Sequence, residues 1–392
     1  MPFSSAYIPY RAWWSSPFCR WQTALAGVHS VELAARVARR AFEARGLSPE
    51  VLDGIVLGIT VHQKQSFYGA PWLASMLGAP GLAGPTVSQA CATSARALVT
   101  AAHEVEVGSR TCVAAICGDR TSNGPHVYYP NPQAPGGRGI GEDPVWDNFN
   151  ADPNTGEAMV QSAEHVVREN GITREEQHEV TLLRYAQYQD ALADDRAFQR
   201  RYMVAAEVGK KLVEADEGVF PTTAEGLAKL RPVLDGGTVT YGAQTFPADG
   251  TAGLLVTTRQ RARALAPNAP ATIRILGYGE ARVGKGRMPT AVVPAAQRAL
   301  EHAGVALADI QVVKTHNPFA VNDIYLCRTL GLAPDNVNRY GSPLIYGHPQ
   351  APTGLRSIIE LIEDLLARGG GKGLFSGCAA GDTAAAVVVE VA

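Results

Sequence analysis

The stretch RAFEARGL, residues 40–47, recurs 258 positions later as RALEHAGV, residues 298–305. Each copy has the apolar spacing of an amphipathic helix and closes at a glycine, the residue favoured just after a helix end. A polar turn with an aspartate follows, and then a β-branched apolar run, 55–57 in one copy and 312–313 in the other, which predicts a strand. A helix and a strand that repeat at a fixed offset predict a duplicated α/β fold.

The repeat continues beyond these strands. A second helix is expected over 94–107 and again over 354–366, each followed by a basic turn that contains glycine. A strand of small residues then ends at 117–119 (Cys-Gly-Asp) in one copy and at 378–382 (Cys-Ala-Ala-Gly-Asp) in the other. Because parallel strands need helical crossovers, two such halves predict a layered protein with helices between and outside two sheets.

An insertion at 120–248 interrupts this symmetry, since it has no counterpart in the second copy and its composition turns polar. It opens with a Pro- and Gly-rich loop at 129–137, and a capping box of Thr173 and Glu176 predicts a helix that runs through Tyr188. Long insertions on α/β cores commonly shape ligand sites. We therefore divide the chain into an N-terminal half at 1–119, completed by about 249–268, an inserted loop domain at 120–248, and a C-terminal half at 269–392.

Composition excludes several classes of protein. With 392 residues, 46% of them apolar and 18% charged, the chain is globular rather than disordered. Its 35 basic and 37 acidic residues leave no basic field for nucleic acid or an anionic membrane. It opens with no signal-peptide pattern and contains no run of about 18 apolar residues. We expect a cytoplasmic protein that binds neither nucleic acid nor membrane.

Cys91 is a candidate nucleophile, because it lies among small residues where an Ala-rich helix is expected to begin. Backbone N–H groups and the helix dipole favour a thiolate there, lower a cysteine pKa, and could hold a developing oxyanion. The alternative is a buried structural cysteine, and the local sequence leaves both open. None of the six cysteines has CxxC or zinc spacing, so we expect no bound metal and no disulfide framework.

Three further residues are candidates because of where they lie in the predicted fold. His348 stands between Gly347 and Pro349, in a rigid loop that suits a base within about 3 Å of a thiol. His316 follows an apolar strand, at the carboxyl end where α/β proteins bind ligands, and Cys378 occupies the equivalent strand end. Each signal is weak alone, and a lone histidine is more often structural, but four such groups in one duplicated fold favour a site.

The chain resembles the thiolase family over essentially its whole length, with markers in family order. Besides the cysteine before a small-residue helix at 88–97, they are Ser-Ala-Glu at 162–164, GITREEQ at 171–177, LRPVL at 230–234, Gly-Tyr-Gly at 277–279, HNPFA at 316–320, Gly-His-Pro at 347–349, and Cys378 with Gly381. The resemblance implies the five-layered αβαβα thiolase fold. It also implies an insertion that covers the pantetheine tunnel and contributes to oligomer contacts.

The resemblance assigns a role to each candidate. Cys91 would be the acylated nucleophile, His348 the base that activates it, and Cys378 the acid and base that faces the other substrate. His316 and His348 would form one oxyanion hole, and the backbone N–H groups of Cys91 and Ala380 would form the other. The implied activity is cleavage or formation of 3-oxoacyl-CoA through an acyl-cysteine, with CoA as a substrate and no permanently bound cofactor.

Departures from the usual thiolase motifs indicate which kind of thiolase to expect. His-Asn-Pro-Phe at 316–319 stands where most thiolases have Asn-Glu-Ala-Phe, and Cys-Ala-Thr-Ser at 91–94 replaces Cys-x-Ser-Gly. The histidine is similar to that of sterol-carrier-type and other divergent thiolases, including those for bulky or aromatic chains such as benzoylsuccinyl-CoA. The expected partners are a second copy in a homodimer or higher oligomer and a small zinc-ribbon/OB-fold protein. The aromatic N-terminus (Tyr10, Trp13, Trp14, Phe18, Trp21) is a candidate surface for that protein, although packing explains it equally well.

Other sequence features give weaker evidence of function. The pairs Arg200-Arg201 and Lys210-Lys211 could meet the phosphates of CoA, although such pairs are more often solvated. Gly277-x-Gly279 lacks the third glycine of a dinucleotide fingerprint. A decarboxylating ketosynthase-like enzyme stays open, and the second cysteine argues against it. A non-catalytic acyl-CoA-binding scaffold or a lyase relative would tolerate loss of the nucleophile, which this chain retains.

Overall fold

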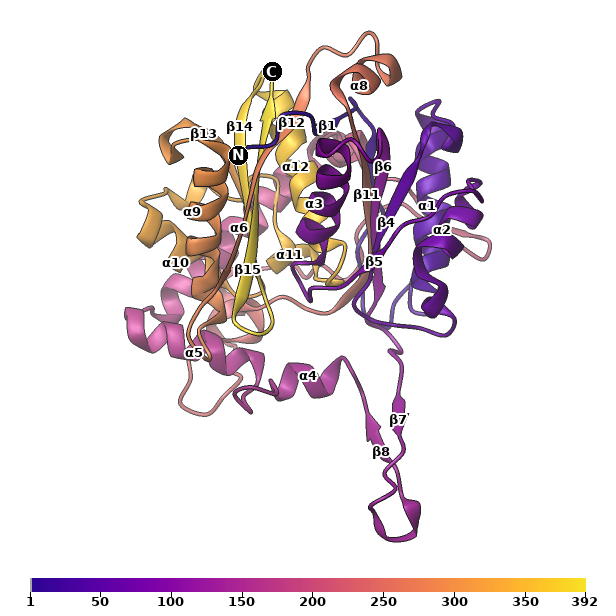
Figure 1. Ribbon diagram of the computed structural model, residues 1–392. Helices are drawn as coiled ribbons and strands as arrows, with labels where there is room; N and C mark the ends of the chain where they lie inside the picture. The colour runs from indigo at the N-terminus through magenta and orange to yellow at the C-terminus, as the bar shows by residue number, and fades with distance from the viewer. Residues whose placement is uncertain (1) are drawn as a thin grey trace.

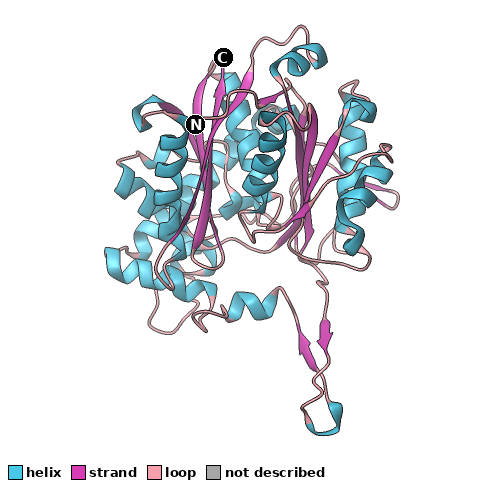
Figure 2. Ribbon diagram, viewed as in Figure 1, coloured by secondary structure: helices cyan, strands magenta, loops and turns pink. Residues whose placement is uncertain are grey.

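The computed structural model describes residues 2–392, which form five layers (Figure 1). Helices α3 (Thr93–Glu106) and α12 (Thr353–Ala367) lie between two sheets, and the remaining core helices cover the outer faces (Figure 2). On one outside lie α1 (Ser30–Ala44) and α2 (Gly69–Leu77), and on the other α9 (Val292–Ala303) and α10 (Ala320–Leu330). The predicted five-layered α/β arrangement is confirmed.

The two sheets have matching strand orders. The first contains β5 (Thr86–Val87), β4 (Gly54–Gly58), β6 (Cys112–Arg120) and β11 (Ala248–Thr257), and the short strands β2 (Trp13–Ser15) and β3 (Cys19–Arg20) pair with β11. The second contains β13 (Ile310–His316), β14 (Gly371–Ala379), β15 (Thr383–Val391) and β12 (Ile273–Arg282), and β1 (Tyr7–Ile8) joins β12 to β11.

Pairing within the sheets confirms the duplication. Strands β4 and β6 run parallel, as β13 and β14 do, and the next strand of each sheet, β11 or β15, is antiparallel. Parallel neighbours bring their carboxyl ends to one edge of each sheet. That edge holds His316 in β13 and Cys378 in β14.

Close packing accounts for the two glycines of β12. A Cβ at Gly277 would lie 2.6 Å from the carbonyl oxygen of Ala299, and one at Gly279 would lie 2.3 Å from that of Ala295. Both oxygens belong to α9, so these glycines allow the helix backbone to approach the sheet. The two glycines therefore serve packing. This agrees with the sequence analysis, in which Gly277-x-Gly279 was too incomplete to predict a dinucleotide site.

The inserted segment adds elements around one end of the core. A hairpin of β7 (Val127–Tyr129) and β8 (Ile140–Glu142) projects from the body (Figure 1). The capping box predicted at Thr173 is present and opens α6 (Arg174–Arg196), which packs against α10 and α11 (Pro343–Tyr346). Other elements of the chain are α4 (Trp146–Asn150), α5 (Met159–Asn170), β9 (Ala206–Val208), β10 (Lys211–Val213), α7 (Ala224–Ala228) and α8 (Arg259–Leu265).

The N-terminal aromatic residues are mainly core. Trp13, Trp14 and Phe18 are fully buried, and the indole N–H of Trp13 donates to Glu363 of α12. The expectation that this segment offers an aromatic surface to a partner is therefore wrong for these three side chains. Trp13 and Trp14 lie on β2, and its pairing with β11 holds them in the interior. In residues 2–392, no helix has the length and apolarity needed to cross a membrane.

Buried charges hold α12 between the sheets. Glu360 contacts Lys314 of β13 and Arg356 of its own helix, and Arg356 also pairs with Asp216 of the inserted segment. All four side chains are fully inaccessible, so each charge depends on its partner for compensation. These pairs join the inserted segment, α12 and strand β13 of the second sheet.

Candidate active site

The turn before α3 presents Cys91. Ala90 has φ of 43°, a left-handed conformation that costs a residue with a Cβ about 1 kcal/mol or more. Thr93 stabilises this turn, because its hydroxyl donates to the carbonyl of Ala90 at 2.7 Å and accepts the N–H of Gln89 at 2.8 Å. The strained turn places the thiol at the start of the central helix, as the sequence predicts.

His348 lies beside this thiol. Its Nε2 is 3.2 Å from Sγ of Cys91, and its Nδ1 is 2.8 Å from the hydroxyl oxygen of Thr353. When Nδ1–H donates to Thr353, the lone pair of Nε2 faces the thiol. Gly347 has φ of 92°, and a Cβ there would lie 2.6 Å from the ring of Phe246, so glycine is needed to bring the histidine into place.

His316 packs against His348 from the end of β13. The ring centroids are 4.1 Å apart, and neither ring nitrogen of the fully buried His316 has a hydrogen-bond partner. Burial lowers the pKa of His316 to about 3, and burial together with His316 holds the pKa of His348 well below its ordinary value. Both imidazoles are therefore neutral at pH 7.

Cys378 completes the group from the end of β14. It is fully buried, and Asn322 donates to its Sγ at 3.2 Å. Burial raises its pKa, and the neighbouring Cys91 raises it further, so Cys378 is a thiol at pH 7. The structure thus brings together Cys91, His316, His348 and Cys378, which lie far apart in the sequence.

The expectation of a lowered pKa at Cys91 is wrong. Burial raises the pKa of Cys91 to about 11, which outweighs the hydrogen bond from the backbone N–H of Ala380. The resting pair is therefore a neutral thiol beside a neutral imidazole. The N–H of Ala380 nevertheless points at Cys91. The family resemblance implies that this N–H is one donor of an oxyanion hole.

A cavity of about 490 Å³, a size that admits a small-molecule ligand, opens onto Cys91, His348 and Cys378, and His316 lies behind its wall. Cys91, His348, Cys378 and Ala380 line it. Its other walls are mainly apolar and come from the inserted segment and from both halves; they include Trp146, Phe149, Met159, Val160, Val233, Tyr241, Met288 and Phe319.

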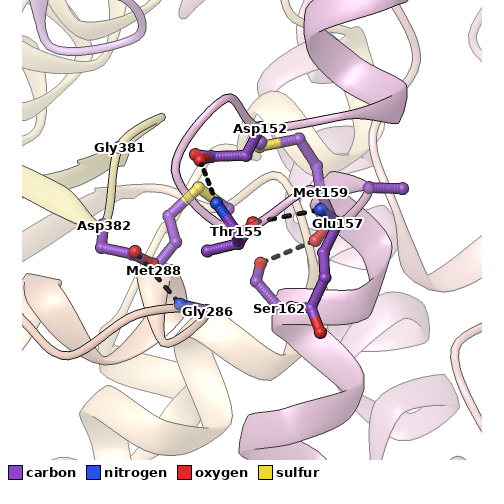
Figure 3. A pocket seen from close by; sticks show the side chains of 10 residues that line it. Asp152, Thr155, Glu157, Met159, Ser162, Gly286, Met288, Gly381 and Asp382 are labelled. Atoms are coloured by element: carbon purple, nitrogen blue, oxygen red, sulfur yellow. Dashed lines mark hydrogen bonds between the residues drawn. The ribbon is translucent and has the colours of Figure 1, made fainter.

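A second, much smaller pocket lies beyond the turn that follows Cys378 (Figure 3). Its volume of about 10 Å³ has room for at most about one water molecule. Asp382 accepts the N–H groups of Gly286 and Arg287 there, and Asp152 accepts that of Thr155. Arg287 beside it pairs with Glu169 of the insertion, so residues around this pocket link the insertion to the C-terminal half. The pocket is too small for a substrate.

The four basic residues proposed for CoA lie elsewhere. Arg200 pairs with Asp195 and Arg201 with Glu363, and both lysines are exposed at the hairpin of β9 and β10. None of Arg200, Arg201, Lys210 and Lys211 lines the cavity. Their contact with CoA phosphates stays a prediction that the geometry of the cavity does not favour.

Asp119 is a residue of the site that sequence reasoning missed. From the end of β6 its buried carboxylate accepts the N–H groups of Thr60 and Val61 at 2.9 Å and that of Ala351 at 2.8 Å, as well as the hydroxyl of Thr60. Ala351 follows His348 by three residues, so Asp119 fixes the loop of the base. The one available signal was the repeat, which aligns Asp119 with Asp382.

Replacement of Asp119 by asparagine is expected to lower the free energy of unfolding by about 1–3 kcal/mol, because the amide leaves a buried N–H unpaired. It should also slow acylation of Cys91, since the loop of His348 loosens. Denaturant unfolding and the single-turnover acylation rate measure these two effects. Asp53→Asn is the matched control, because Asp53 also binds two N–H groups and a hydroxyl but lies at the opposite end of the sheet. Equal acylation rates in the two variants would contradict the assignment.

The fold and the Cys–His pair together define a class of protein, the α/β acyltransferases with a cysteine at the start of the central helix. The thiolase N-terminal domain matches residues 14–260, and the thiolase C-terminal domain matches residues 269–391. The chain belongs to the thiolase family.

Individual relatives agree with this assignment. An acetyl-CoA acetyltransferase of Escherichia coli (strain K12) is 30% identical over 380 residues, covering 93% of this chain and 94% of the relative. The crystal structure of human mitochondrial 3-ketoacyl-CoA thiolase in complex with CoA matches with a TM-score of 0.91 at 25% identity, covering 100% and 99% of the two chains. The Bacillus anthracis acetyl-CoA acetyltransferase matches with a TM-score of 0.90 at 28% identity over the full length of both.

Proposed function

We propose that this protein is a thiolase that cleaves or forms 3-oxoacyl-CoA through an acyl-Cys91 intermediate, with CoA as its second substrate. One observation carries the proposal. A thiol in contact with a neutral imidazole, Cys91 with His348, shares one cavity with a second thiol, Cys378. Carbon–carbon cleavage of a 3-oxoacyl thioester needs these three groups, namely a soft nucleophile, a base and a proton donor for the departing carbanion.

The first half-reaction follows from these positions. As the Cys91 sulfur attacks the 3-oxo carbonyl carbon, its proton passes to Nε2 of His348. The bond between C2 and C3 then breaks, its electron pair remains on C2, and the Cys378 thiol gives C2 a proton. The shortened acyl-CoA leaves, and the acyl group stays on Cys91 as a thioester.

In the second half-reaction Cys378 accepts a proton and His348 gives one back, the reverse of their roles in the first. The Cys378 thiolate accepts the proton of the incoming CoA thiol, whose sulfur attacks the acyl group on Cys91. Collapse of the tetrahedral intermediate expels the Cys91 sulfur, which recovers its proton from His348. Backbone N–H groups of Cys91 and Ala380 stabilise the oxyanion on the acyl-enzyme, and His316 with His348 stabilises the enolate of the other thioester.

We further propose that the acyl group is bulky or aromatic. Trp146 and Phe149 of α4 line the cavity together with Met159 and Met288, and these apolar walls leave about 490 Å³. Apolar walls of this kind favour large acyl chains by hydrophobic burial. A chain of the benzoylsuccinyl type fits this description.

A decarboxylating ketosynthase-like condensing enzyme is the second candidate, because Cys91, His316 and His348 form a Cys–His–His group. Such an enzyme has no use for Cys378, which lines the same cavity. Retention of both the nucleophile and its base likewise argues against a non-catalytic acyl-CoA-binding scaffold. Assembly as a homodimer or higher oligomer, a zinc-ribbon/OB-fold partner and a cytoplasmic location remain proposals that the family resemblance motivates.

The test is direct. The protein is mixed with CoA and a panel of 3-oxoacyl-CoA thioesters, and cleavage is followed by loss of the 3-oxoacyl chromophore and by chromatography of the products. A thiolase yields two acyl-CoA products, and aromatic chains should be cleaved faster than acetoacetyl-CoA. Release of carbon dioxide from malonyl thioesters, without cleavage of any 3-oxoacyl-CoA, would favour the ketosynthase.

His316→Asn is expected to keep partial thiolase activity, because an amide can donate to the enolate oxygen directly or through a water molecule. His316→Ala should lower the turnover number by about 10²–10³-fold, the cost of one oxyanion-hole donor. Steady-state kinetics of both variants on one substrate measure the difference. Near-wild-type turnover in both would remove His316 from the site.

A further inference from the structure

The strongest unexplained feature is the pair of unpartnered ring nitrogens on His316. The side chain is fully buried, and neither nitrogen has a hydrogen-bond partner. Buried polar atoms without partners are rare and point to a ligand that completes them. A substrate oxygen would account for at most one of these two nitrogens, and only while substrate is bound.

The surroundings suit a second kind of ligand. One atom each from Cys91, His316 and His348 can be chosen so that all three lie within 4.8 Å of one another. The planes of the two histidine rings are tilted by 32° to each other. His316 ends β13, and His348 lies in the loop before α12. Among residues 2–392 this is the one group of three such side chains close enough to hold an ion.

We propose that Cys91, His316 and His348 form a binding site for a divalent cation of the zinc type, which blocks acyl transfer reversibly when it binds. Thiolate and imidazole are ligands that suit zinc, and two of the three, Cys91 and His348, line the cavity through which an ion can enter. The thiol proton of Cys91 leaves to solvent as the metal–sulfur bond forms.

Geometry and charge agree with this site. Zinc lies about 2.3 Å from sulfur and about 2.0–2.1 Å from nitrogen, so its ligand atoms are roughly 3.5 Å apart. Cys91 and His348 are already at 3.2 Å, and the third atom has to move by roughly 1 Å. The buried carboxylate of Asp119 accepts the N–H of Ala351 in the loop of His348, and its negative charge favours a cation in this part of the site.

Binding of the cation does not depend on the proposed acyl transfer, whereas the block of acyl transfer rests on the proposed function. The site depends on His316, whose imidazole supplies the third ligand beside Cys91 and His348. An asparagine would leave a two-ligand pair, which binds zinc weakly. The three ligands come from segments far apart in the chain, so no zinc spacing was visible in the sequence.

Cobalt(II) is the direct probe, because a thiolate bound to it gives a near-ultraviolet charge-transfer band. Titration of the reduced protein should produce this band at one equivalent. His316→Asn should weaken cobalt binding by at least about tenfold, since loss even of a second-shell partner costs 10–100-fold. The surface control His126→Asn should bind as the wild type does, because His126 is exposed. Absence of the band, or equal affinity in His316→Asn and His126→Asn, would overturn the proposal.

A second readout uses zinc itself. Zinc should prevent alkylation of Cys91 by iodoacetamide, and a chelator should restore it, as peptide mass mapping shows. In His316→Asn the same zinc concentration should leave Cys91 open to alkylation. This assay needs no thiolase substrate, so its outcome is separate from that of the proposed function. Full alkylation of wild-type Cys91 in saturating zinc would overturn the site.

Discussion

Cys91→Ala is expected to lower thiolytic turnover by at least about 10⁴-fold, because it removes the group that carries the acyl chain. The loss should appear in the turnover number, while substrate binding in the apolar cavity stays close to normal. Steady-state cleavage of a 3-oxoacyl-CoA, with substrate binding measured separately by calorimetry, distinguishes the two effects.

Cys327→Ala is the matched control for this prediction. Cys327 is also buried, but it lies on α10 and does not line the cavity. Its loss should leave turnover within about twofold of the wild type after correction for the folded fraction. Turnover of Cys91→Ala within tenfold of the wild type would exclude a covalent mechanism at this residue.

Cys378→Ser is expected to separate the two halves of the reaction. Cys378 moves a proton to or from C2 and the CoA thiol, and a serine hydroxyl has a pKa far above that of a thiol. Carbon–carbon cleavage should therefore fall by about 10²–10⁴-fold. Acylation of Cys91 by a simple acyl-CoA should survive, because Cys91 and His348 remain in contact.

Both quantities are measured on one preparation, acylation by intact mass and cleavage by the 3-oxoacyl chromophore. Cys327→Ser makes the same substitution at a buried site outside the cavity and controls for stability. If Cys378→Ser keeps wild-type rates of both steps, the role given to Cys378 is wrong and the ketosynthase alternative gains.

The duplicated architecture could be predicted from the sequence because each copy of the repeat is marked by signals between residues that are close along the chain. Helix spacing, closing glycines and β-branched runs at a constant offset identify α1 with α9 and β4 with β13. The capping box at Thr173 located α6 for the same reason, since a cap depends on residues within one turn. Residues at strand ends, such as His316 and Cys378, could be placed because parallel strands share an edge.

Properties that depend on tertiary packing were not predicted. A helix start suggested a lowered pKa at Cys91, but burial between the sheets raises it. Asp119 and Thr353 escaped notice because their partners are a backbone N–H and a ring nitrogen that only the fold brings near. The aromatic N-terminus looked like a surface because short strands such as β2 carry no clear alternation.

The central claim is that the acyl group resides on Cys91 between the half-reactions. The protein is mixed with a 3-oxoacyl-CoA in the absence of free CoA, quenched with acid within one turnover, and analysed by intact mass and peptide mapping. The account predicts an added mass equal to the acyl fragment that begins at C3, less the thiol hydrogen it replaces, on the peptide containing Cys91, and this added mass disappears when CoA is supplied. An acyl group on another residue, or unmodified protein while 3-oxoacyl-CoA is being cleaved, would contradict it.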